Sequence, residues 1–162
     1  MNLSSARLFG TDGVRGTPGE FPLDKRTLAR LGASIARTCR RPDGSLRVLI
    51  GRDTRESGEW ITGQLARGLA TEAASITNGG LLSTPAIAFL TRDGGFDAGI
   101  VVSASHNPFQ DNGVKVITGS GEKADDGLET RIAALVADQT WVVPDSPVPS
   151  PKTVACGEPY IV

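Results

Sequence analysis

One short stretch of the chain gathers residue types that could carry out group transfer. It runs from Ser103 to Pro108 and contains two serines, an asparagine and the single histidine of the sequence. A serine hydroxyl becomes a usable nucleophile when a base or a preorganised charge lies beside it. Lys115 could supply that charge, or act as a base if its pKa is lowered. The stretch therefore indicates a serine nucleophile assisted by a lysine.

The flanking residues predict how these groups are positioned. Residues 98–102 are a short, β-branched apolar run typical of a buried strand, and Pro108 predicts a loop after it. Asn112-Gly113 is a strong reversal signal, and the alternating residues 114–117 predict an antiparallel return strand. We therefore expect a long loop over 103–113 at the carboxyl end of a strand, where open α/β sheets bind ligands. The residues expected to share one small volume are Ser103, Ser105, His106 and Lys115.

An ordinary polar turn is the simplest alternative, because Ser, Asn and Pro are common turn residues. The order of the residues favours a function instead. The stretch reads Ser103-Ala104-Ser105-His106-Asn107-Pro108, and Asn112-Gly113 and Lys115 follow it. It resembles the phosphoserine loop of the α-D-phosphohexomutases, whose signature is Thr or Ser, then Ala or Gly, then Ser-His-Asn-Pro, followed by Asn-Gly and a lysine. Each part of that signature is present in this sequence.

A second signature lies near the N-terminus, where residues 8–17 read Leu-Phe-Gly-Thr-Asp-Gly-Val-Arg-Gly-Thr. Its glycines permit a tight backbone path around Thr11 and Asp12. The segment could be a glycine-rich exposed loop, or a shaped loop that holds Arg15 to grip a phosphate with two hydrogen bonds. It resembles the N-terminal signature of the same family, most closely that of its phosphoglucosamine mutase branch. Two signatures in family order make a coincidence improbable.

The resemblance implies a role for each matching residue. Ser105 is expected to carry the transferable phosphoryl group, with Lys115 as general acid or base and Arg15 stabilising charge. His106 stands in the catalytic loop, where it and Asn107 are expected to shape the loop and to form hydrogen bonds. Residues expected to bind phosphate or to support the loop are Ser103, Asn107, Thr11, Asp12 and Arg52.

Arg52 belongs to a run, Gly51-Arg52-Asp53-Thr54-Arg55, that follows the buried strand predicted over residues 46–50. An Arg-Asp-x-Arg run could simply be a structural ion-pair network. In the family, the corresponding segment lies under the active site and supports it. Both interpretations stay open from the sequence.

The resemblance also implies a reaction and a cofactor. Phosphorylated Ser105 would donate to a hydroxyl of a hexose monophosphate, and the bisphosphate formed would return its other phosphoryl group. Mg²⁺ would bind an oxygen of the phosphate on Ser105 and neutralise charge during transfer. The family's magnesium loop, Asp-Gly-Asp-Gly-Asp-Arg, is absent from this sequence, and Asp125-Asp126-Gly127 lacks its alternation. We expect the other ligands in further domains of the same full-length chain, and we expect the isolated chain to be inactive.

The favoured function is the interconversion of glucosamine 6-phosphate and glucosamine 1-phosphate. The expected partners are hexosamine or hexose phosphates and their bisphosphates. The first alternative is a phosphomannomutase or phosphoglucomutase domain, because the sugar-recognition loop is not in this sequence. The second alternative is a non-catalytic α/β module that binds phosphate, and phosphate incorporation at Ser105 distinguishes it.

The composition is that of an ordinary globular protein, with 162 residues, a net charge of −1, 39% hydrophobic and 5% aromatic residues. The sequence has no basic stripe that would indicate nucleic acid and no apolar run long enough for a membrane span. Met1 to Phe9 lacks the apolar core of a signal peptide. Cys39 and Cys156 have neither disulfide-framework nor metal-ligand spacing. We infer a cytoplasmic setting.

The remaining elements predict the fold class. Apolar stripes and caps predict helices from Asp24 to Arg40, after Ser57, over 85–92 with Thr84 as cap, and from Asp126. The strands alternate with these helices, which favours parallel pairing. We expect a three-layer α/β/α domain with a mixed, mostly parallel sheet of about four strands. Residues 1–153 form this domain, and 154–162 are expected to be a linker or the start of a following domain.

Overall fold

A mixed β-sheet organises the part of the chain that the computed structural model describes, residues 7–153. Its strand order is β1-β5-β4-β2-β3-β6. The strands are β1 (Val14–Gly16), β2 (Arg47–Arg52), β3 (Ser75–Leu81), β4 (Ala98–Val102), β5 (Asn112–Thr118) and β6 (Lys152–Thr153). The pairs β2–β3, β2–β4 and β3–β6 are parallel, whereas β5 runs antiparallel to both β4 and β1. The predicted mixed sheet is confirmed, with six strands instead of about four.

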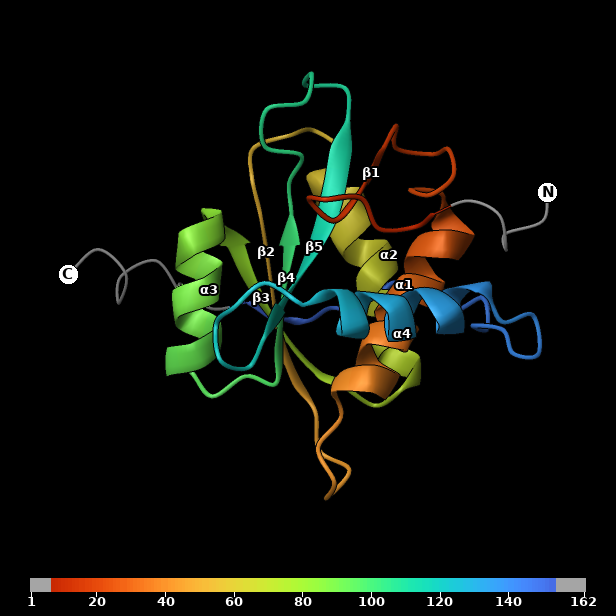
Figure 1. The fold of residues 1–162 in the computed structure, drawn as a ribbon, viewed down its shortest axis with the longest axis vertical. Coiled ribbons are helices and arrows are strands. Elements are labelled where there is room, and N and C mark those ends of the chain that lie inside the picture. Colours follow the sequence, from red (N-terminus) through yellow and green to blue (C-terminus); the bar gives the residue numbers. More distant parts are fainter. Residues whose placement is uncertain (1–6, 154–162) are drawn as a thin grey trace.

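Helices cover both faces of the sheet, as predicted. They are α1 (Lys25–Cys39), α2 (Gly58–Thr71), α3 (Thr84–Asp93) and α4 (Asp126–Ala137). Figure 1 shows α3 alone on one face, with α1, α2 and α4 on the other. None of these helices is both long and apolar enough to cross a bilayer.

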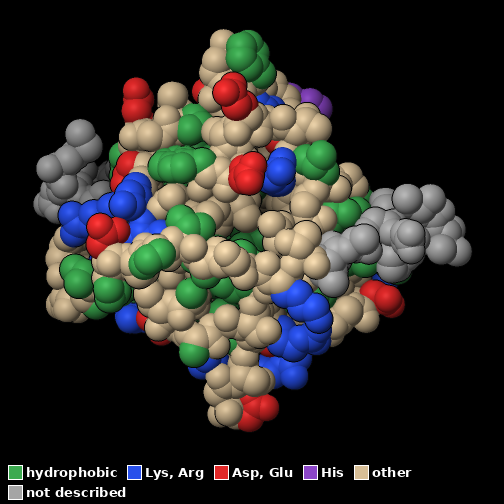
Figure 2. Space-filling view, turned by 180° about the vertical axis from the view of Figure 1, so that it is seen from behind, with side chains coloured by type: hydrophobic (Ala, Val, Ile, Leu, Met, Phe, Trp, Pro, Cys, Tyr) green, Lys and Arg blue, Asp and Glu red, His purple; other side chains and the backbone are tan. Residues whose placement is uncertain are grey.

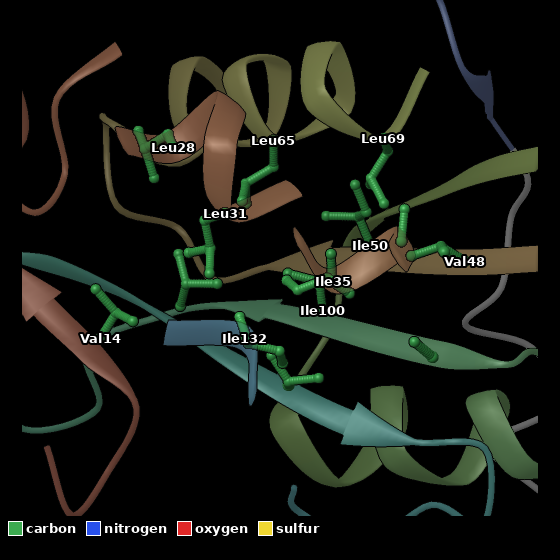
Figure 3. Close-up of a cluster of buried hydrophobic side chains, with 14 of the residues drawn as sticks. Val14, Leu28, Leu31, Ile35, Val48, Ile50, Leu65, Leu69, Ile100 and Ile132 are labelled. Carbon is green, nitrogen blue, oxygen red and sulfur yellow. The ribbon is translucent and has the colours of Figure 1, made fainter. Parts of the chain in front are cut away.

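The larger part of the core lies between the sheet and the three helices on one face. The stripe of α1 supplies Leu28, Leu31 and Ile35, all fully buried. Figure 3 shows side chains of α1 and α2 meeting Ile50 of β2 and Ile100 of β4. Burying one such side chain stabilises the fold by about 1.5–3 kcal/mol. This face therefore fixes the sheet from which the loop after β4 leaves.

The N-caps of α1 and α2, Asp24 and Ser57, agree with the sequence, whereas those of α3 and α4 differ by one residue. Asp24 accepts a hydrogen bond from the backbone N–H of Thr27 at 2.9 Å, as predicted for the N-cap of α1. The caps of α3 and α4 are Ser83 and Asp125 instead of Thr84 and Asp126. In both cases the residue before the predicted one is also a good capping residue, and the backbone conformation decides between them.

The return strand begins earlier than the sequence indicated. Asn112 and Gly113 lie inside β5, paired with Gly16 and Arg15 of β1, so they do not form the predicted reversal. A Cβ atom on Gly113 would lie 2.7 Å from the carbonyl oxygen of Ser103 and 2.8 Å from that of Val14. Glycine is required there because two flanking backbones approach closely. The loop between β4 and β5 therefore covers 103–111.

Candidate active site

Ser105 lies in the loop that leaves the carboxyl end of β4, at the upper edge of the sheet in Figure 1. Its residue is exposed, and its backbone has φ of 50°. That left-handed conformation costs a non-glycine residue about 1–3 kcal/mol and persists only where neighbouring groups hold it. The Nζ atom of Lys115 donates to the Oγ atom of Ser105 at 3.2 Å. The predicted contact between serine and lysine is therefore present.

The group that holds this loop is Arg55. Its Nη2 atom donates to the carbonyl oxygens of Ser105 at 2.9 Å and Asn107 at 3.1 Å. Its Nη1 atom donates to the carbonyl oxygens of Pro108 at 2.6 Å and Asp111 at 3.1 Å. One rigid guanidinium thus fixes the backbone of the loop at four points.

Arg55 was not among the predicted site residues, whereas Arg52 was. Arg52 makes one long hydrogen bond, at 3.4 Å, to the carbonyl oxygen of the next residue, and its side chain packs beside Gly58 at the start of α2. The four loop contacts therefore belong to Arg55, and the role expected for Arg52, phosphate binding or loop support, stays a prediction. The Arg-Asp-x-Arg run was the available signal, but it did not distinguish the two arginines.

Asp53 joins the same network from below the loop. Its Oδ2 atom accepts from the Nε atom of Arg55 at 3.1 Å and from the hydroxyl of Ser103 at 2.7 Å. The Ser103 hydroxyl in turn accepts from the backbone N–H of Ser105 at 3.1 Å. Ser103 therefore supports the loop, as the resemblance implied, and the run around Asp53 is an ion-pair network that also supports the site.

Arg15 approaches the loop from β1. Its Nη1 atom donates to the Oδ1 atom of Asn107 at 2.5 Å, and its Nη2 atom lies 3.8 Å from a carboxylate oxygen of Asp12. Its Nε atom is buried and has no hydrogen-bond partner among the described residues. Buried polar groups are normally satisfied, so this unpaired N–H is an exception among the described residues. The pairing of β1 with β5 is what brings Arg15 to this edge.

The turn before β1 packs directly against Lys115. Gly13 has φ of 90°, and a Cβ atom there would lie 2.4 Å from the carbonyl oxygen of Val114 and 2.9 Å from Cγ of Lys115. Lys123 holds the turn by donating to the carbonyl oxygen of Thr11 at 2.6 Å. Thr11 therefore contributes through its backbone.

Burial and neighbouring charges change the acidity of Lys115. Its pKa is lowered, first by burial and then by the positive charge of Arg15, with Asp12 acting in the opposite direction. A lysine with a lowered pKa holds a larger fraction of its amine in the neutral form, which can accept a proton. The arrangement can therefore move a proton at Ser105 Oγ while Arg15 holds a nearby anion.

His106 differs from the other predicted residues. It is exposed, and within residues 7–153 its side chain makes no hydrogen bond or ion pair. Figure 2 shows the histidine side chain at the surface, close to the end of the molecule where the 103–111 loop lies. Hydrogen bonds of the loop thus connect Ser103 with Ser105, Ser105 with Lys115, and Asn107 with Arg15. His106 has no such contact within residues 7–153.

The described residues do not themselves form a metal cage. No group of three or more His, Cys, Asp or Glu side chains in 7–153 is arranged to hold an ion. The exposed hydroxyl of Ser105 could contribute one ligand oxygen once it carries a phosphate. Magnesium sites usually combine phosphate oxygens with carboxylates, so a complete site requires groups from outside the described residues.

Comparison with known proteins gives a consistent result. Residues 6–142 match the family described as phosphoglucomutase/phosphomannomutase, alpha/beta/alpha domain I. Phosphoglucosamine mutase of Koribacter versatilis is 48% identical over 136 residues, which cover 84% of this chain and 29% of that protein. Phosphoglucosamine mutase of Solibacter usitatus is 41% identical over 155 residues, which cover 95% of this chain and 34% of that protein.

Solved structures show the same architecture. A putative phosphomannomutase from Thermus thermophilus superposes with a TM-score of 0.76 and is 28% identical, covering 94% of this chain and 34% of that one. A phosphoglucomutase/phosphomannomutase family protein from Burkholderia thailandensis gives a TM-score of 0.78 at 25% identity, covering 95% and 34%. The chain thus spans about a third of the length of the relatives it matches.

Proposed function

This chain belongs to the phosphoglucomutase/phosphomannomutase family as its α/β/α domain I, and we propose that it is the phosphoserine-bearing domain of a phosphoglucosamine mutase. The enzyme would interconvert glucosamine 6-phosphate and glucosamine 1-phosphate through a bisphosphate. The observation that carries the proposal is the contact between Lys115 Nζ and the exposed Ser105 Oγ at 3.2 Å. The names of the two relatives with 48% and 41% identity support the choice of sugar.

The proposed chemistry follows from the groups around Ser105. When the serine attacks a bisphosphate, its Oγ–P bond forms and the serine proton must leave. The bond from phosphorus to the sugar oxygen breaks, and that oxygen takes up a proton from solvent to become a hydroxyl. Neutral Lys115 can accept the serine proton, because its pKa is lowered and its Nζ atom already contacts Oγ. In the reverse direction the protonated lysine returns it. General acid–base assistance of this kind contributes typically about 10²–10⁴-fold in rate.

Arg15 is proposed to hold the phosphoryl group during transfer. Its charge would neutralise part of the negative charge on the phosphoryl oxygens. Asn107 fixes the guanidinium from the loop side. The arginine is therefore held beside the loop before an anion arrives.

Mg²⁺ is the proposed cofactor, and it would be held in part by an oxygen of the phosphate on Ser105. When bound, it would supply positive charge to the transferring group. The other ligands and the sugar-binding groups are proposed to come from further domains of the full-length protein. A cytoplasmic location is also part of the proposal and depends on the sequence alone.

A phosphomannomutase is the second candidate, because the Thermus thermophilus protein that superposes at a TM-score of 0.76 carries that description. Full-length enzyme assayed with the 6-phosphates of glucosamine, mannose and glucose separates the two. Peptide mapping after incubation with a hexose bisphosphate tests the mechanism itself. Phosphate on Ser105 supports it, whereas phosphate on Ser103 or His106 with none on Ser105 would exclude it.

A further inference from the structure

A cleft with an apolar floor and cationic side chains at its edge lies between the start of α1, the second half of α2 and the chain that follows α4. Its volume is about 340 Å³. Four of its lining side chains are cationic, Lys25, Arg26, Arg30 and Arg67, and one is a carboxylate, Asp145. None of the residues assigned to the candidate active site lines it. The cleft therefore has an excess of positive charge that the proposed reaction does not use.

Asp145 neutralises this excess only in part. Its carboxylate oxygen Oδ1 lies 3.2 Å from Nζ of Lys25 and 3.3 Å from Nη2 of Arg67. The side chain of Asp145 is nevertheless 82% exposed. Exposed ion pairs of this kind add little stability, so a carboxylate held in this way can be displaced by a stronger anion.

Arg67 is the buried member of the cluster. Its side chain is 5% exposed, and its Nη1 atom donates to Oε1 of Gln64 at 2.7 Å. Its Nε atom is buried without a hydrogen-bond partner among the described residues. The guanidinium is therefore held in place, and its Nη2 atom, which contacts Asp145, is a preformed donor for an oxyanion that displaces this carboxylate.

Arg30 adds positive charge without needing a partner in the cleft. Its guanidinium donates to the carbonyl oxygens at the end of α4 and stacks on the ring of Trp141. Its pKa is lowered by burial and then by the charge of Arg26. The like charges are therefore crowded, and an anion in the cleft would relieve that repulsion.

A purely structural explanation of the cluster is that the ion pairs of Asp145 hold the segment after α4 against α1 and α2. That explanation accounts for the ion pairs of Asp145, but it leaves a single carboxylate facing four cationic side chains in the cleft. We propose that the cleft binds a phosphate group, which takes the place of the Asp145 carboxylate between Lys25 and Arg67. A phosphate carries more charge than a carboxylate and suits two or more cationic donors. The proposal does not depend on the function assigned to Ser105.

The phosphate group could be free inorganic phosphate or part of a sugar phosphate, and one titration distinguishes the two. Residues 1–162, labelled with ¹⁵N, are titrated in separate experiments with inorganic phosphate and with glucosamine 6-phosphate, at ionic strength held constant with chloride. The Nε–H signal of Arg67 and the amides of the first turn of α1 are followed. We expect these signals to shift and to saturate with one or both ligands. The ligand that saturates them at the lower concentration identifies the source of the phosphate group.

Substitutions test whether the response comes from this cleft. We expect Arg67→Gln and Lys25→Gln each to weaken binding by about 10-fold or more, read from the α1 amides. We expect Asp145→Asn to tighten it by about 3-fold or more, because the competing carboxylate is lost. Asp93→Asn is the matched control, since it removes the same charge from exposed α3 on the other face of the sheet.

The result that would overturn the proposal is equally direct. Shifts that do not saturate with either ligand would exclude the proposal. Equal affinities of the Asp145→Asn and Asp93→Asn proteins for the ligand would mean that Asp145 only holds the segment after α4 against α1 and α2. Lys25 is exposed, so Lys25→Gln remains informative if Arg67→Gln does not fold. Dispersed amide spectra of each variant show whether it has folded.

Discussion

Arg55 holds Ser105 through the backbone of the serine and makes no hydrogen bond to the serine hydroxyl. The Nη2 atom of Arg55 donates to the carbonyl oxygen of Ser105 at 2.9 Å, while the hydroxyl of Ser105 contacts Lys115. The side chain of Arg55 is only 10% exposed, and its Nε atom is paired with Asp53. The orientation of the proposed nucleophile therefore depends on a residue that does not touch its reactive atom.

Replacing Arg55 should consequently affect catalysis more than substrate binding. In the full-length enzyme we expect Arg55→Lys to lower kcat by about 10²-fold, since a lysine cannot hold four carbonyl oxygens and small misplacements have effects of that size. KM for the sugar phosphate should change little. Steady-state kinetics measure both constants.

Arg52→Lys is the matched control for this experiment, because Arg52 is the neighbouring arginine that makes no contact with the loop. We expect its kcat to stay within about 3-fold of the parent, a difference of roughly 0.7 kcal/mol in the barrier. Equal losses of kcat in the two variants would show that the four contacts of Arg55 do not position Ser105.

Lys115 leads to a prediction about rate and pH together. We expect Lys115→Ala to lower kcat by about 10²–10⁴-fold, the usual effect of losing a general acid or base. In the parent, transfer from a bisphosphate to Ser105 should increase with pH as Lys115 loses its proton. The midpoint should lie below the ordinary lysine value, because burial and Arg15 lower this pKa. Single-turnover labelling of Ser105 across pH measures it.

The same pKa shift predicts an opposite effect on stability. A lysine whose pKa is lowered by folding binds its proton more weakly in the folded state, so the charge destabilises the fold at pH values below the folded pKa. Replacing Lys115 by methionine should therefore keep or raise the midpoint of thermal unfolding at pH 7 while activity falls. A clearly lower midpoint would indicate that Lys115 contributes to stability through its contacts.

Much of the architecture could be predicted from local patterns. The apolar run of β4 and the stripe of α1 are long or distinctive enough to define their elements, and the loop after β4 follows from Pro108. The three-residue β1 and two-residue β6 have no such pattern, because each is extended only through pairing with a distant strand. The reversal predicted at Asn112-Gly113 failed for the same reason. The conformation of these two residues is set by contacts with β1 and with the loop after β4, which are distant in sequence.

The sequence predicts those candidate site residues that belong to an ordered motif. It predicts less well those whose role depends on the direction in which the side chain points. Ser105 and Lys115 were predicted to lie together because the motif fixes both, and their side chains are in contact. The choice between Arg52 and Arg55 depends on which way each side chain points. Arg52 still belongs to β2 and faces the start of α2, whereas Arg55 lies in the turn beyond the strand and faces the loop.

Gly113 should be one of the least replaceable glycines in the sheet. A Cβ atom there would meet backbone oxygens on two sides, at 2.7 Å and 2.8 Å, and neither can move without shifting a strand. We expect Gly113→Ala to lower the free energy of unfolding by about 1–3 kcal/mol, as overpacking does. Gly10→Ala is the control, since its nearest contact is an ordinary 3.5 Å. Similar urea midpoints for the two variants would contradict the close approach.

The last prediction concerns residues 1–162 on their own, which should fold but should not turn over a sugar phosphate. Folding is expected because buried clusters cover both faces of the sheet. Circular dichroism and a cooperative thermal transition test this part. The apolar core described here needs no partner to exclude water, so an unfolded chain would show that packing against further sequence is essential.

The absence of turnover is expected for a reason of charge and position. Phosphoryl transfer depends on neutralising the transferring group and on holding the acceptor hydroxyl in line. Arg15 and Lys115 supply part of the cationic field, but the described residues include no carboxylate cluster for Mg²⁺. A coupled mutase assay with and without Mg²⁺ measures turnover. Magnesium-dependent activity that disappears in Ser105→Ala would show that this one domain assembles a complete active site, and that the proposed contribution of other domains is wrong.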